Sequence, residues 1–81
     1  MDGQVIASPH YYHHAQRVFE VVDRLRGKAQ QLFDAANVLR KHQADESLPF
    51  GERSRAAILI EEANELAKEH LDLADRLIRD H

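Results

Sequence analysis

The stretch that decides the fold is residues 11–39, which reads YYHHAQRVFEVVDRLRGKAQQLFDAANVL. Its apolar residues recur in alternating steps of four and three without a slip, which is the heptad pattern of one helix face. They are Tyr11, Ala15, Val18, Val22, Leu25, Ala29, Leu32, Ala36 and Leu39. Ser8 and Pro9 form a helix-start signal, because Ser caps free N–H groups and Pro suits the first helical position. The pattern predicts one helix over residues 9–42.

The helix should continue through Gly27, because the apolar residues before and after the glycine keep the same heptad spacing and so lie on the same helix face. Residues 43–51 are the one turn-like stretch, and Pro49 disfavours a helical conformation for the residue before it. We expect Leu48 and Phe50 to fold back over the open end of the hairpin. A second helix is predicted over residues 52–80, and the short loop makes the two helices antiparallel. The whole of residues 1–81 then forms a single domain.

The second helix carries two adjacent apolar rows. The first row holds Ala56, Leu59, Ala63, Leu66, His70, Leu73 and Leu77, and the second holds Ile60, Ala67, Leu71, Ala74 and Ile78. On a helical wheel of about 100° per residue, the rows cover an arc of about 160°. A single neighbouring helix cannot cover this arc. We therefore expect an all-α helical hairpin that is completed by association, as a homodimeric four-helix bundle.

Composition excludes several functional classes. The chain has 81 residues and no Cys, so disulfides and thiolate metal sites are excluded. Its longest apolar run, residues 56–60, is far too short to span a membrane, and residues 1–8 do not resemble a signal peptide, so we expect a cytoplasmic protein. A net charge of −3 argues against a nucleic-acid partner. These features favour a small non-enzymatic interaction or regulatory module that needs no cofactor and binds a second copy or another helical protein.

Acidic residues form the first candidate site. Residues 61–65 read EEANE, which resembles the EExxE helix motif of the MazG-like, all-α nucleotide pyrophosphohydrolases, and residues 71–75 resemble the later acidic motif of that family. The resemblance implies that Glu61, Glu62, Glu65 and Asp75 bind Mg²⁺ over a nucleoside triphosphate. Clustered carboxylates are the ligands that Mg²⁺ requires. The alternative is that these side chains form a solvated face of the helix.

Histidines form the second candidate site, because the chain contains six of them. His10 and His14 are four residues apart, so both rings project from one face of the first helix, a spacing that can chelate Zn²⁺. The antiparallel pairing brings His81 beside His14, with Asp80 as a further group. This arrangement predicts a zinc site at His10, His14 and His81. The alternative is ordinary surface histidines near the chain ends.

Overall fold

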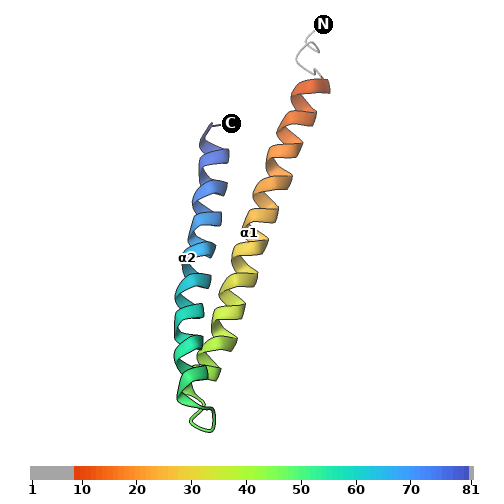
Figure 1. Cartoon of the computed structure of the whole chain (residues 1–81). Coiled ribbons are helices and arrows are strands. Elements are labelled where there is room, and N and C mark those ends of the chain that lie inside the picture. Colours follow the sequence, from red (N-terminus) through yellow and green to blue (C-terminus); the bar gives the residue numbers. More distant parts are fainter. Residues whose placement is uncertain (1–8, 81) are drawn as a thin grey trace, which may run out of the picture.

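The structure, a computed structural model, describes the backbone of residues 9–80 and the side chains of residues 15–80. It consists of two helices, α1 (Pro9–Ala44) and α2 (Phe50–Asp80), which run antiparallel side by side and are joined by residues 45–49 (Figure 1). No strand occurs within residues 9–80. The predicted all-α hairpin is confirmed. Both predicted helices are correct, although α1 ends two residues later and α2 begins two residues earlier than expected.

The loop is closed by a short network around Asp45. The Asp45 carboxylate accepts hydrogen bonds from the Ser47 backbone N–H at 2.9 Å and from the Ser47 hydroxyl at 2.6 Å. These bonds lower the pKa of Asp45, and the nearby charges of His42 and Arg53 lower it further. The carbonyl of Pro49 then accepts from the N–H groups of residues 52 and 53, so α2 begins directly after the proline.

A row of small residues joins the two helices. The buried residues are Val22, Ala29 and Ala36 of α1 and Ala56, Ile60, Ala67 and Ala74 of α2. Most of them recur every seven residues, as the heptad pattern predicts. Because alanine is small, the helix backbones can approach closely, and the larger residues beside this row are displaced to its edges. Leu25, Leu32 and Leu39 are accordingly half-buried.

On α2 the structure divides both apolar rows, since Ala56 of the first row is buried whereas Ile78 of the second row is exposed. Ile60, Ala67 and Ala74 of the second row face α1. The leucines of the first row do not, since Leu59, Leu66 and Leu73 are 40%, 44% and 45% exposed. The physical reason is that α1 presents its own small residues at the contact, so the row of α2 with the smaller side chains gives the closer fit.

The expectation that Phe50 covers the open end of the hairpin is wrong. Phe50 is 81% exposed, whereas Leu48 is half-buried. The Arg53 side chain lies level with Gln43, so Phe50, three residues earlier, lies beyond the end of α1 at Ala44. Its ring lines a hollow together with Gln43 of α1 but remains largely exposed.

Gly27 does not interrupt α1, as the sequence predicts. It is exposed, and a methyl group added there would meet no atom within 4 Å. Within residues 9–80, neither helix contains an apolar segment of the length that crossing a bilayer requires.

Candidate interaction surface and candidate metal ligands

One side of the hairpin presents a continuous apolar surface, which we call the leucine face. It consists of Val21, Leu25 and Leu32 of α1 and Leu59, Leu66 and Leu73 of α2. Leu32 and Leu66 lie on the same side of the molecule because they line one hollow between the helices. The other members follow at spacings of seven or four residues along their own helices, which places them on the same side.

The hollow at the centre of the leucine face has a volume of about 270 Å³ and is lined by Lys28, Gln31, Leu32, Leu66 and His70. The Nδ1 atom of His70 lies 2.8 Å from the carbonyl oxygen of Leu66. Since a carbonyl oxygen only accepts, this bond requires a proton on Nδ1 and leaves Nε2 as the second polar atom of the ring. The leucine face therefore carries polar groups only near its centre, from Lys28, Gln31 and His70.

The opposite side of the hairpin is less continuous. Its apolar residues, among them Phe33 and Leu71, alternate at heptad spacing with Arg26, Arg40 and Asn64. Charged or amide groups thus interrupt every apolar row there. The leucine face carries apolar residues along both helices, with its polar groups gathered near the centre, and exposed apolar surfaces of this kind mark sites of protein association.

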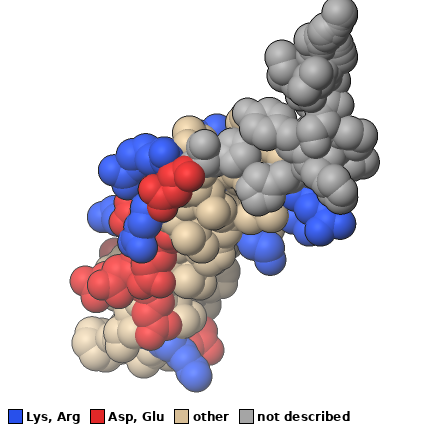
Figure 2. Space-filling model, turned by 90° about the horizontal axis from the view of Figure 1, so that it is seen from above, with Lys and Arg blue, Asp and Glu red and all other residues tan. Residues whose placement is uncertain are grey.

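Charged residues border the leucine face on both helices. Beside the leucines of α2, at seven-residue spacing, lie Arg55, Glu62, Glu69 and Arg76, all exposed. Beside the apolar residues of α1 lie Arg17 and Arg24, also exposed. Figure 2 shows the acidic side chains gathered on the side of the molecule where α2 lies, with basic side chains both beside them and across the molecule. Over its full length α1 carries six basic and three acidic residues, and α2 five basic and eight acidic ones.

The four carboxylates predicted to bind Mg²⁺ all lie exposed on α2. Glu61 and Glu65 line one shallow hollow of about 320 Å³ together with Asn64 and Lys68. Glu62 projects from a different side of the helix, and Asp75 follows Glu65 by ten residues, which is about 15 Å along the helix axis. One copy of the chain therefore does not gather these four side chains around a single ion. Among the described side chains, no group of three or more metal-binding residues converges.

The histidine site remains a prediction. His10 and His14 fall in the first turns of α1, where the side chains lie outside the described residues, and His81 lies outside them altogether. Asp80 is the last residue of α2.

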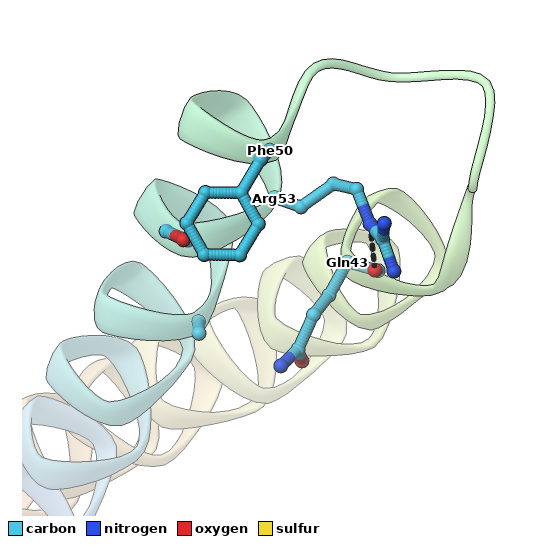
Figure 3. A pocket seen from close by; sticks show the side chains of 5 residues that line it. Gln43, Phe50 and Arg53 are labelled. Carbon is cyan, nitrogen blue, oxygen red and sulfur yellow. Dashed lines mark hydrogen bonds between the residues drawn. The ribbon is translucent and has the colours of Figure 1, made fainter.

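A third hollow lies at the loop end, and no sequence pattern predicted it. Gln43, Phe50, Arg53, Ser54 and Ala57 line a hollow of about 200 Å³ (Figure 3). Arg53 reaches across from α2, and its Nε–H donates to the carbonyl oxygen of Gln43 at 3.0 Å. This carbonyl belongs to the last turn of α1, where a cation is favourable for the helix dipole. The contact fixes the register between the helices.

Comparisons of the chain with models of protein families, with curated proteins and with solved structures find no match.

Proposed function

We propose that this chain acts in the cytoplasm as a small non-enzymatic interaction module, and that it works by associating through the leucine face into a homodimeric four-helix bundle. The observation that carries the proposal is the row formed by Leu59, Leu66 and Leu73, which is exposed along α2 although it adjoins the contact with α1. A second hairpin laid on this row would bury it.

The composition of the internal contact supports the same conclusion. Five of the seven buried hydrophobic residues are alanines. Hydrophobic stabilisation scales with the apolar area removed from water, at about 25 cal/mol per Å², so alanines contribute little of it. Among residues 15–80, the large apolar side chains other than Val22 and Ile60, which could contribute most, lie half-buried or exposed. Association would bring them into a core and supply the stabilisation that one hairpin lacks.

The test is the molar mass in solution, measured by sedimentation equilibrium over a range of concentrations. We expect a species of twice the 9.3 kDa chain mass at micromolar concentration. Leu66→Ala should raise the dissociation constant by at least about tenfold, because truncating a buried leucine costs about 2 kcal/mol or more at each copy. Ile58→Ala is the matched control: Ile58 is 58% exposed on a different side of α2, and its truncation should leave the constant within about twofold.

Two results would contradict the proposal. One is a stable, compact species of 9.3 kDa at every concentration. The other is equal weakening by Leu66→Ala and Ile58→Ala, which would place the association elsewhere.

The hydrolase predicted from the EExxE resemblance is the competing proposal, favoured by the presence of Glu61 and Glu65 in one hollow. Incubation of the pure protein with nucleoside triphosphates and Mg²⁺ separates the two. We expect neither pyrophosphate nor nucleoside monophosphate to form, whereas their release, abolished by Glu62→Gln with Glu65→Gln, would favour the hydrolase.

A further inference from the structure

The leucine face can pair with a second copy of itself in two symmetric ways, and this inference about which one occurs rests on the proposed function. In the same-end arrangement the two-fold axis runs parallel to the helices, both loops lie at one end, and each α1 packs on α2 of the other copy. In the opposite-end arrangement the axis is perpendicular to the helices and the loops lie at opposite ends. Each helix then packs on its own counterpart, antiparallel.

The contacts within one hairpin determine which residues meet in the same-end arrangement. A two-fold axis parallel to the helices leaves every residue at its own height along them. Residues that are level within one hairpin are therefore also level across the interface. Within one hairpin, the Arg53–Gln43 bond places these two residues at the same height, and the hollow that Lys28 and His70 line does the same for that pair. Lys28 of one copy thus lies level with Glu69, the neighbour of His70, in the other copy.

The charges bordering α2 disfavour the opposite-end arrangement. The border of α2 carries one charged residue every seven positions, namely Arg55, Glu62, Glu69 and Arg76. The order of their charges, positive, negative, negative, positive, is the same when it is read from either end of the helix. When α2 packs antiparallel on α2 of a second copy with full overlap, Arg55 meets Arg76 and Glu62 meets Glu69. Every one of these cross-helix pairs joins like charges, which repel.

In the same-end arrangement Glu69 gains partners of opposite charge, whereas Arg76 lies within about one turn of Arg17 and Arg24 of the second copy. The two glutamates of the border are therefore no longer set against each other. The border of α2 then faces the border of α1, where Arg24 and Lys28 lie within about one turn of Glu69 of the second copy. At the level of whole helices, α1 has an excess of three basic residues and α2 an excess of three acidic ones. Such charge complementarity selects orientation even where each exposed pair adds little stability.

Side-chain size favours the same pairing. Leu59, Leu66 and Leu73 would face the α1 row of Val21, Lys28 and Ala35. The apolar residues of this row are smaller than leucine, and the lysine can extend along the surface. In the opposite-end arrangement the leucine row of α2 would instead face the leucine row of the second copy. The α1 row of Val21, Lys28 and Ala35 would likewise face the same row of the second copy. Large residues against small ones fill an interface more evenly.

We propose that the partner covering the leucine face is a second copy of this chain in the same-end arrangement, with each α1 lying against α2 of the other copy.

Distances between spin labels test this arrangement, because the chain has no cysteine and a single substitution gives a single label site. Glu46→Cys places a nitroxide in the exposed loop. The same-end arrangement predicts a label separation below about 30 Å, since neighbouring helices pack 8–10 Å apart. The opposite-end arrangement predicts about 45 Å or more, the length of a 31-residue helix. Gln30→Cys, near the middle of the hairpin, should give a short distance in both and is the control for dimer formation.

Charge reversal gives an independent test, because the two arrangements predict changes of the dissociation constant in opposite directions. Glu69→Lys should raise the dissociation constant of the same-end dimer about three- to tenfold, and adding Lys28→Glu should restore it. In the opposite-end dimer, Glu69→Lys would relieve the repulsion with Glu62 and lower the constant. Glu61→Lys makes the same change of charge away from the interface and should leave the constant within about twofold.

The outcomes separate this inference from the proposed function. A dimer with widely separated loop labels, or one that Glu69→Lys tightens, overturns the same-end arrangement and leaves the function intact. A molecule that stays monomeric overturns both. A short loop-label distance together with rescue by the double charge reversal supports the same-end dimer.

Discussion

Gly27 lies in the interior of the 36-residue helix α1 with open space around it. Glycine in a helix interior is about 1 kcal/mol less favourable than alanine, because its backbone loses more freedom on folding. Nothing in the described structure requires glycine here, since none of the described glycines has a positive φ and no atom lies near the missing methyl group.

Gly27→Ala should therefore raise the free energy of unfolding by about 0.5–1 kcal/mol per chain in urea titrations. Gly51→Ala is the comparison. Gly51 is equally open but lies in the first turn of α2, where the helix frays, so the gain there should be smaller. Destabilisation by Gly27→Ala would instead indicate that the associated state brings another backbone close to this position.

The pKa of the Asp45 carboxyl group is lowered from the ordinary value of 3.8. Hydrogen bonds from the Ser47 hydroxyl and backbone N–H favour the carboxylate, and the charges of His42 and Arg53 add to the effect. Because the folded pKa is lower than the unfolded one, the carboxylate stabilises the fold above the unfolded pKa. That contribution is lost as the pH falls through the folded pKa.

We expect an NMR titration to give Asp45 a pKa below 3.8 and Ser47→Ala to bring it back toward that value. Ser54→Ala, which removes a hydroxyl from α2 without a bond to Asp45, should leave the titration unchanged. Equal pKa values in the parent protein and in Ser47→Ala would show that the Ser47 hydroxyl does not set the charge of this loop.

At the scale of single elements, α2 divides its surface between an apolar side and an acidic one. Glu61, Glu65 and Glu69 follow one another at spacings of four residues, where like charges each cost a few tenths of a kcal/mol. The helix tolerates this repulsion because the side chains are exposed and hydrated. The predicted magnesium ligands Glu62 and Asp75 lie too far apart along α2 to share an ion within one copy.

The acidic side of α2 should therefore behave as a solvated surface. Millimolar Mg²⁺ should move the melting temperature by less than about 2 °C, and Glu62→Gln with Glu65→Gln should change the unfolding free energy by less than about 0.5 kcal/mol. Differential scanning fluorimetry with and without Mg²⁺ measures both effects. A large stabilisation by Mg²⁺ that the double substitution abolishes would overturn this view and favour the hydrolase.

At the scale of the whole molecule, the described residues form a single layer of two helices, of which the longer, α1, extends about 54 Å. The accessible surface of the chain is 6366 Å², against roughly 5,000 Å² for a compact protein of this mass. A two-helix layer has no second layer to cover its faces, and stable domains pack at least two layers around a core. Association on the leucine face would supply the second layer.

The proposed dimer should melt at a temperature that depends on concentration, because association stabilises only the folded state. A tenfold increase in protein concentration should raise the melting temperature by about 4 °C, given the unfolding entropy of two such chains. Circular dichroism measures the melting temperature at each protein concentration. In the variant Leu66→Ala, the same melting temperature should require a higher protein concentration. A melting temperature that is constant over a hundredfold range would contradict the dimer.

The sequence by itself determined the two helices, their approximate ends and the turn between them. These features are local: the heptad period of residues 11–39 depends on the geometry of one helix, and Pro49 acts on its immediate neighbour. The presence of two apolar rows on the second helix could also be predicted from the period alone, and the proposed association began from it. The candidate ligands Glu61, Glu62, Glu65 and Asp75 could be named from spacing, but spacing does not show whether side chains converge.

Only the tertiary structure decided which row of α2 faces α1. The leucine row and the row of Ile60, Ala67 and Ala74 have the same periodicity, so the choice depends on the shape of the opposing helix. Because α1 offers Ala29 and Ala36 at the contact, the small row packs inward and the leucines remain outside. The exposure of Phe50 and the Arg53–Gln43 bond likewise depend on where one helix ends relative to the other. The hydrophobic period of either helix does not predict this relative position.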